Sequence, residues 1–590
     1  MKKKLMLLLS LFLLLMLLVC IGDGGTSEDG IAEEDKKAVG NEAAEGEFSY
    51  SDALPAVEFS RAAGFYEEPF ELSLSTDAAG GNIYYTLDGS TPDENSALYE
   101  GELLIEDASE RDNIWSDIPD TSAYFYQELL SDENGKPVSS YTGTGFPVDK
   151  CTVVKAVYID EEGNKGPVST ASYFIGLKEK PAYRDIRVVS LSFDPELFFG
   201  HEDGIYVTGA DFDEWFADHD YGKSVKGKWQ YWTANYTRSG EAAEREVTAE
   251  IFDEEGKLLC TNTAGARVQG NVSRGTRAKS LSLYAKGLGD DGYFSPELFS
   301  DKIAYPVIEL YAGSMEKTRF RNYLGQTLAA GCSFSTIESI PCMLFLEGEY
   351  WGMYDLGWRY GTAYVAAAYD IPQEDVIFVK NGEVKSDGEN DVYYFKQLTS
   401  FIGNNDMSSA HNYEEACKML DMDSYIDYYA TMLYWARNGD WPGTNYALFR
   451  SRTGEGEGYR DGRWRFMLFD LDKLCYTKEL TDYDSFYAAI NGGGEMENML
   501  KSLLKNKSFR ESFRDRMLEL ADTAYSPGRV DGIIEDYLDH YEAEILHHHE
   551  RFAEAEPYTE EMLEETLSGI SYFFKNRRQY IEKLLAEYAG

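Results

Sequence analysis

The sequence predicts a multidomain protein in which an N-terminal antiparallel β-sandwich precedes an α+β domain that ends in helices. Between residues 57 and 174, short runs of alternating apolar and polar residues are separated by turn dipeptides, which is typical of a sandwich. From about residue 185, strand-like runs alternate with helical patterns, and helical patterns dominate the C-terminal part. A length of 590 residues fits two to four domains of about 150 residues each.

The charge balance excludes one broad class of function. The chain has 55 Lys and Arg against 104 Asp and Glu, a formal net charge of -49. A general nucleic-acid binder must place cations on phosphates, so no nucleic-acid partner is expected. The excess of carboxylates suits a partner rich in Lys, Arg and Ser, or metal ions. A surface that only keeps the protein soluble is the alternative.

The N-terminus predicts export. Three lysines precede an apolar stretch from Leu5 to Ile21, the pattern of a secretory signal, and the stretch is short for a membrane span. Cys20 closes the stretch and resembles the lipidated cysteine of a bacterial lipoprotein signal, although Val19 stands where a small residue is usual. We therefore expect a signal or lipoprotein-type segment over 1–21 and a membrane-anchored protein at the bacterial cell surface. A retained anchor or plain cleavage is the alternative.

An acidic, Gly-rich stretch over 22–55 has few large apolar residues and predicts a disordered tether. The predicted sandwich covers 56–176, with strand-like runs such as 83–87, followed by the turn pair Asp88-Gly89. The segment IYYTLDGSTP over 83–92 resembles the chitobiase/hexosaminidase C-terminal-type module, with 106–150 as an insertion. Such a module implies an accessory domain that acts as a spacer or contacts sugars.

The predicted α+β domain covers 185–545, and a helical extension covers 546–590. Its strand-like runs are 186–191, 280–284 and 343–346, and its helix-like runs are 413–435 and from 508 onward. The histidines 547–549 look like a metal tract, but consecutive residues of a helix point to different faces, so a packed helix is the simpler interpretation.

Two segments carry the candidate chemistry. Asp440 and Asn445 are five residues apart on a Pro/Gly turn after an apolar helix, and a buried strand over 464–469 leads into Asp470 and Asp472. If the extended geometry continues, these two aspartates project from one side and can hold a hard cation. This is the arrangement of a protein-kinase-like phosphotransferase. A capping Asp, a turn Asn and an acidic loop are the structural alternative.

Several motifs in the same order resemble the CotH spore-coat protein kinase family. The segment 267–274 reads RVQGNVSR and is followed by Lys279-Ser280, and 345–356 reads FLEGEYWGMYDL. The segments NGDWPGTN over 438–445 and WRFMLFDLD over 464–472 match two further blocks. The resemblance implies an α+β atypical protein-kinase-like domain with a helical C-terminal part, and transfer of phosphate from ATP to Ser or Thr of a protein with Mg²⁺ or Mn²⁺.

The resemblance also implies residue roles. Asp440 would be the catalytic base, and the metal ligands would be Asn445, Asp470 and Asp472. Lys279 and Arg274 would contact the ATP phosphates. As alternatives, Lys279 is a solvated charge at a strand edge and Arg274 forms a surface salt bridge.

The chain departs from the family pattern at two places. Trp358 occupies the position of a Glu that would pair with the phosphate-contacting Lys, which leaves Asp355 or Glu349 as substitutes, or weakened catalysis. The block that usually reads LRN is LYA over 310–312. The alternative function is therefore a non-catalytic surface scaffold that binds cell wall, polysaccharide or protein. A glycan-processing enzyme with paired carboxylates is a third option.

Overall fold

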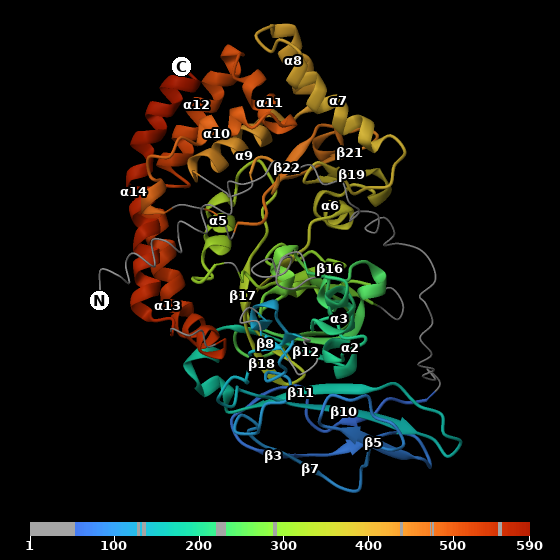
Figure 1. Ribbon diagram of the computed structural model, residues 1–590. Helices are drawn as coiled ribbons and strands as arrows, with labels where there is room; N and C mark the ends of the chain where they lie inside the picture. Colours follow the sequence, from blue (N-terminus) through green and yellow to red (C-terminus); the bar gives the residue numbers. More distant parts are fainter. Residues whose placement is uncertain are drawn as a thin grey trace. The chain divides into compact units, whose positions relative to one another are not determined.

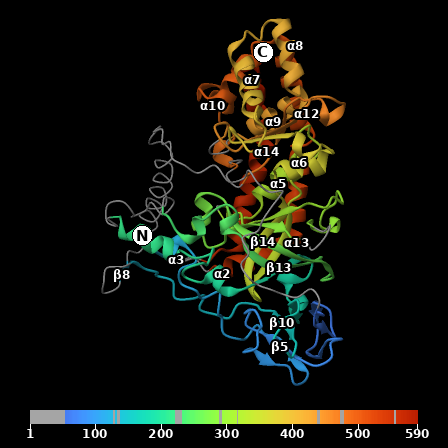
Figure 2. The same cartoon turned by 90° about the vertical axis from the view of Figure 1, so that its right-hand side faces the viewer.

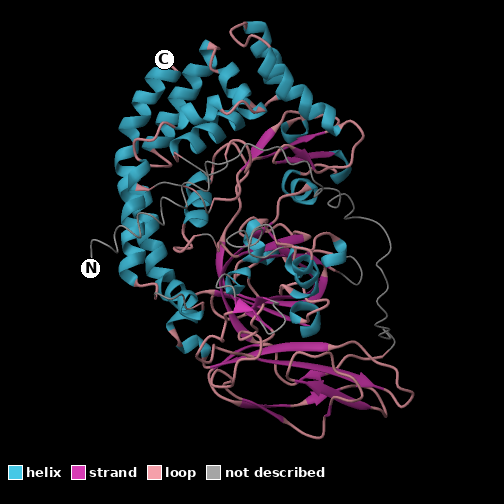
Figure 3. Cartoon of the chain, viewed as in Figure 1, coloured by secondary structure: helices cyan, strands magenta, loops and turns pink. Residues whose placement is uncertain are grey.

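The computed structural model describes residues 54–126, 130–131, 137–219, 232–286, 292–314, 316–436, 441–471, 474, 477–552 and 557–590. The predictions for Cys20 and for nearly all of the tether lie outside these ranges. Within them, the fold class is confirmed: strands dominate the N-terminal region, a mixed α/β region follows, and helices form the C-terminal part (Figure 3). None of the described helices has both the length and the apolar character that crossing a bilayer requires.

The N-terminal module is built on a five-stranded sheet of order β2-β11-β10-β5-β6. Its strands are β2 (Gly64–Tyr66), β5 (Asn82–Thr86), β6 (Ala97–Leu98), β10 (Thr152–Ile159) and β11 (Ser169–Ile175). Two short pairs complete it, namely β1 (Glu58–Phe59) with β4 (Leu74–Ser75), and β3 (Phe70–Leu72) with β7 (Leu103–Ile105). Strand β10 is buried on both faces. Val154 and Ala156 face the module core, whereas Val153 packs into the main core of the following domain.

The segment between β7 and β10 adds no strand to this sheet. Its described part contains a 3-10 turn over Ala123–Tyr126 and the short pair β8 (Leu130–Ser131) and β9 (Pro137–Val138). The segment is held against the next domain, because the backbone N–H groups of Ile114 and Ser116 donate to the Glu349 carboxylate at 2.6 and 2.7 Å. This segment corresponds to the predicted insertion over 106–150.

The α/β region begins with a closed barrel of order β12-β13-β14-β15-β16-β18-β17. Its strands are β12 (Arg187–Phe193), β13 (Arg245–Phe252), β14 (Leu258–Gln269), β15 (Ser280–Ala285), β16 (Val307–Tyr311), β17 (Ile340–Leu346) and β18 (Glu349–Trp358). Alternate apolar residues such as Leu281, Leu283 and Ile308 fill the interior. The other residues of β15 and β16, Ser282 and Glu309 among them, therefore lie on the outer face.

The β17–β18 hairpin docks the module onto the barrel. Glu347 and Gly348 both have positive φ (46° and 79°), the conformation of a two-residue turn that favours Gly at its second position. The Glu347 carboxylate lies 3.5 Å from the Lys155 ammonium of β10, and both side chains are almost fully buried. Burial raises the pKa of Glu347 to about 7, against the opposing effect of Lys155.

A smaller sheet of order β20-β19-β21-β22 follows the barrel. Its strands are β19 (Val376–Lys380), β20 (Glu383–Val384), β21 (Ala447–Ser451) and β22 (Arg465–Met467). Residue Lys380 pairs with Ala447, and Ala447 pairs with Met467, so the end of β19, the start of β21 and the end of β22 share one edge. This edge positions the candidate site.

Helices complete the fold. Those before the C-terminal part are α2 (Pro195–Phe199), α3 (Gly209–Ala217), α5 (Arg321–Ala329), α6 (Thr362–Tyr369), α7 (Asp391–Asn404), α8 (Ala410–Met419) and α9 (Met422–Tyr434). The last are α10 (Ser485–Asn491), α11 (Glu495–Leu503), α12 (Lys507–Asp522), α13 (Pro527–Arg551) and α14 (Glu560–Tyr588). The predicted helix over 413–435 is divided at Asp421, whose side chain caps α9 by accepting from the Ser424 N–H. Helix α13 runs along β18, and α14 lies beside α13 (Figures 1 and 2).

One buried arginine ties the C-terminal helix to α9. Arg577 of α14 is fully buried, and its guanidinium donates to the carbonyls of Leu433 and Tyr434 at the end of α9. The same group donates to the carbonyls of Thr481 and Tyr483. Because the last carbonyls of a helix have no partner within it, this cation satisfies the α9 C-terminus.

Candidate active site

Asn445 lies at the shared edge of the small sheet, two residues before β21. It is nearly buried and has a φ of 58°, a left-handed conformation that Asn tolerates better than most residues. Its backbone N–H donates to the Asn381 side-chain oxygen at 2.8 Å, and its carbonyl accepts from the Tyr428 hydroxyl at 3.1 Å. These contacts fix the residue at the edge of the sheet and leave its side chain available for a ligand role.

Asp470 lies at the same edge, three residues after β22. Its φ is 60°, so the extended geometry ends before this residue. The assumption that Asp470 and Asp472 continue an extended strand and project from one side is therefore wrong at Asp470. Asp472 and Asp440 lie outside the described residues, and their predicted roles stay predictions.

Two charged residues at this site were not predicted. Lys380 ends β19, and its ammonium lies 4.6 Å from the centre of the Phe469 ring, directly before Asp470. Glu309, on the outer face of β16, has a raised pKa because it is desolvated and feels Asp470, while Lys380 and Arg359 oppose the rise. The barrel and the small sheet thus place Glu309, Lys380 and Asp470 in one electrostatic cluster. The one signal in the sequence that could have indicated these two residues is a charged residue in an apolar strand: Glu309 within VIELY and Lys380 at the end of VIFVK.

The outer face of the barrel beside this cluster carries cations. The Arg267 guanidinium lies 4.2 Å from the centre of the Tyr284 ring and forms an ion pair with Glu244 at 2.7 Å. Arg359 donates to the Tyr284 hydroxyl. In a chain with a net charge of -49, this concentration of guanidinium groups is suited to an anionic ligand such as a polyphosphate.

Lys279 and Arg274, the two predicted phosphate contacts, have protein partners. The Lys279 side chain is fully buried, donates to the carbonyls of Arg274 and Thr276 at 2.6 and 2.8 Å, and lies 4.4 Å from the Tyr236 ring centre. Desolvation lowers its pKa well below the usual range. The Arg274 guanidinium donates to the carbonyls of Gly270, Thr237 and Arg238. Both side chains therefore brace the loop between β14 and β15, and Lys279 is not a solvated strand-edge charge.

The family model described as CotH kinase protein matches residues 266–581, which is more than half of the chain. The chain belongs to the CotH kinase protein family. A second model, described as Fn3 associated, matches residues 66–173 and supports an N-terminal module at the predicted place. No curated protein matches the chain.

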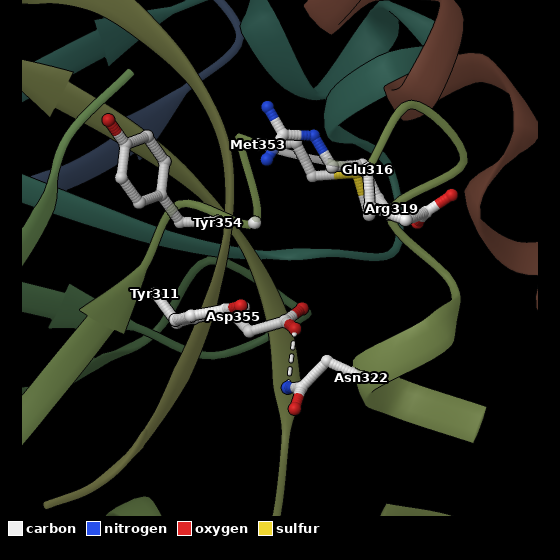
Figure 4. Close-up of a pocket in the computed structure, with 8 residues that line it drawn as sticks. Tyr311, Glu316, Arg319, Asn322, Met353, Tyr354 and Asp355 are labelled. Carbon is white, nitrogen blue, oxygen red and sulfur yellow. Dashed lines mark hydrogen bonds between the residues drawn. The ribbon is translucent and has the colours of Figure 1, made fainter. Parts of the chain in front are cut away.

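Trp358 of this CotH kinase family member stands where the family pattern has a Glu, and its side chain lies inside the barrel. Trp358 packs there against Phe299, Tyr305 and Tyr364, with ring centres 5.1 to 5.8 Å apart. Of the two proposed substitutes, Glu349 accepts the backbone N–H groups of the insertion. Asp355 accepts from the Asn322 amide at 3.1 Å (Figure 4). Neither carboxylate pairs with Lys279.

The histidines 547–549 of the CotH kinase domain lie in helix α13 and contact other parts of the protein, as the packed-helix interpretation predicts. His547 contacts Asp149 and the Tyr183 hydroxyl, both at 3.0 Å. His548 is buried and accepts from the Met353 N–H, and His549 contacts the Lys317 carbonyl. The three rings thus point to different partners.

The residues of the candidate site fit a magnesium site to which the protein supplies only a few ligands. No group of three or more His, Cys, Asp or Glu side chains within the described ranges is placed to hold a metal ion. Magnesium is usually bound by one or two carboxylates together with substrate phosphates and water. Asp470 and the Asn445 amide at one sheet edge, with Lys380 beside them, match that description.

Proposed function

We propose that this CotH kinase family protein transfers the γ-phosphate of ATP to a Ser or Thr hydroxyl of a protein partner, with Mg²⁺ or Mn²⁺. The observation that carries the proposal is the edge of the small sheet, which brings together Asn445, Asp470 and Lys380, while the charges of Lys380 and Asp470 act on Glu309 of the barrel. A metal-binding carboxylate beside a lysine and an outward-facing arginine surface is what a bound triphosphate requires.

The chemistry follows from these roles. The acceptor oxygen forms a bond to the γ-phosphorus, the bond from that phosphorus to the β,γ-bridging oxygen breaks, and ADP leaves. Asp440 accepts the hydroxyl proton. Asp470 and Asn445, with Asp472 as a third ligand, would hold the metal ion, which would neutralise charge on the phosphates. Lys380 adds a fixed cation near the phosphates, a role that the sequence motif had given to Lys279 and Arg274.

The location and partner form part of the same proposal. A lipidated Cys20 followed by an acidic tether would hold the domain at the outer surface of a bacterial membrane, with the module as a spacer or a contact to cell wall or polysaccharide. A net charge of -49 favours a substrate rich in Lys and Arg around its Ser residues, because opposite charge speeds encounter. No membrane contact other than the N-terminal anchor is proposed.

A second candidate, a non-catalytic surface scaffold, is favoured by one observation. Lys279 is enclosed by carbonyl oxygens and aromatic rings, and Trp358 replaces its expected carboxylate partner. If the family chemistry depends on that pair, the kinase-like fold serves binding alone.

The deciding experiment incubates the full-length protein with labelled ATP and Mg²⁺ or Mn²⁺. Autophosphorylation that is abolished in Asp440→Asn supports transfer. Calorimetry that detects no nucleotide binding with either metal supports the scaffold.

A further inference from the structure

A second hollow lies apart from the sheet edge, between the insertion of the module and the kinase domain. Its empty space, counted together with the part that is open to solvent, is about 360 Å³. The insertion supplies Ser116 and Thr144, the barrel supplies Arg277 and Trp351, and the end of α13 supplies Arg551. Nothing in the proposed transfer reaction uses these residues.

The Arg551 guanidinium is buried and has no carboxylate partner among the described residues. Only 4% of the residue is exposed, and the described part of the chain places no Asp or Glu within ion-pair distance of its guanidinium. The Nε group donates to the Tyr350 carbonyl at 3.3 Å, and the guanidinium carbon lies 5.1 Å from the centre of the Trp351 ring. Because an uncompensated buried charge destabilises a fold, a missing anion is the simplest account of this arrangement.

A second guanidinium lines the same hollow. Arg277 lies 4.9 Å from the centre of the Phe125 ring and donates to the Phe552 carbonyl. Arginines held flat against aromatic rings lose little entropy on binding and present their N–H edges to planar or tetrahedral oxyanions.

The hydroxyl of Ser116, which has no hydrogen-bond partner in the described part of the chain, also lines the hollow. The Ser116 Oγ is buried and has no hydrogen-bond partner, although most buried polar atoms in proteins have one. The backbone around it is fixed, since the Ser116 N–H donates to Glu349 and the Ser116 carbonyl accepts from the Tyr141 hydroxyl at 2.9 Å. The hydroxyl can therefore donate to a ligand in the hollow without any backbone movement.

We propose that this hollow is a binding site for a small oxyanion, the phosphate or carboxylate group of a ligand, held by Arg551, Arg277 and Ser116. The surrounding surface of a chain with a net charge of -49 repels anions, so binding depends on these groups. Arg277 lies in the same loop as Lys279 and Arg274, and Ser122 of the insertion donates to the Gly275 carbonyl of that loop at 2.9 Å. A bound oxyanion would thus join the module, helix α13 and the loop that carries the family motif.

The test is a calorimetric titration of the full-length protein with inorganic phosphate at constant ionic strength. Acetate in place of phosphate shows whether a carboxylate or a phosphate is the preferred group. We expect saturable binding that is weakened about tenfold or more in Arg551→Met and in Arg277→Gln, because each loses a charge-assisted contact. Arg514→Gln, on the exposed side of α12, is the matched control and should bind as wild type does.

A second measurement separates this hollow from the nucleotide cleft. Without any oxyanion, Arg551→Met should raise the thermal unfolding midpoint, since it removes a buried charge that has no carboxylate partner, and phosphate should then add less stability than in wild type. If Arg551→Met does not fold, the half-buried Arg277 still reports the binding loss. Absence of saturable binding by both anions overturns the proposal. Binding that is unchanged in both arginine variants but lost in Lys380→Met also overturns it, because the anion then occupies the cleft.

Discussion

Glu250 is predicted to make the stability of the protein fall as the pH rises from 4.5 to about 7. The residue lies on β13, is 1% exposed, and has one carboxylate oxygen without a hydrogen-bond partner. Burial raises its pKa from an ordinary 4.5 to about 7, although hydrogen bonds from Ser172 of the module oppose the rise. The folded protein therefore holds this proton more tightly than the unfolded chain does.

The sign and size of the effect follow from this difference. The stabilising contribution is complete below pH 4.5 and is lost as the pH rises to about 7, where the buried carboxylate becomes charged. At about 1.4 kcal/mol for each pH unit between the two pKa values, the loss is about 3 kcal/mol. Glu250→Gln keeps the shape and removes the charge, so it should stabilise the protein by about that amount at pH 8 and hardly at all at pH 5.

Urea unfolding at the two pH values measures the prediction in wild type, Glu250→Gln and Glu246→Gln. Glu246 lies on the same strand and is exposed, so its substitution should change stability little at either pH. An equal gain from Glu250→Gln at pH 5 and pH 8, or no gain at pH 8, would refute the reasoning, because the charge would then not be the destabilising element.

Three further predictions concern the candidate site and its support. Asp470→Asn should weaken metal-dependent nucleotide binding in calorimetry, whereas Asp440→Asn should leave binding near normal and abolish phosphate transfer; transfer at the wild-type rate in Asp440→Asn would end the assignment of that loop. Lys380→Met should weaken ATP binding about tenfold or more, while Lys385→Met, a nearby residue paired with Glu383, should not, and equal affinities would remove Lys380 from the site. Arg577→Met should lower the free energy of unfolding by about 3 kcal/mol or more, because it leaves buried carbonyls without a donor, and a loss under 1 kcal/mol in urea unfolding would contradict that role.

Much of the fold could be predicted because it depends on local patterns. The alternation in β15 and the apolar run of β17 predicted two strands, which the structure places in the barrel, and the order of motifs identified the family. Asn445 and Asp470 were also chosen from sequence, and the structure brings both to one edge. Their proximity depends on the pairing of β21 with β22, which joins segments that are only a short loop apart.

The rest depended on contacts between distant segments. Lys380 reaches the site because β19 pairs with β21, across more than sixty residues, and Glu309 of the distant strand β16 feels the charges of Lys380 and Asp470. Lys279 was predicted from its motif, but its burial depends on Tyr206 and Tyr236, which no local pattern around the motif reveals. The change of direction at Asp470 is a backbone property that an apolar strand pattern does not encode.

The contact of Arg577 with the end of α9 has a consequence for the order of events during synthesis. The cation that donates to the last carbonyls of helix α9 lies 143 and 144 residues further along the chain, so it is made much later than α9 itself. The N-terminal module and the barrel can form while the ribosome is still translating, because their strands are complete long before. The end of α9 must wait until α14 has emerged, so a chain that has been translated only as far as α13 lacks the guanidinium that donates to the Leu433 and Tyr434 carbonyls.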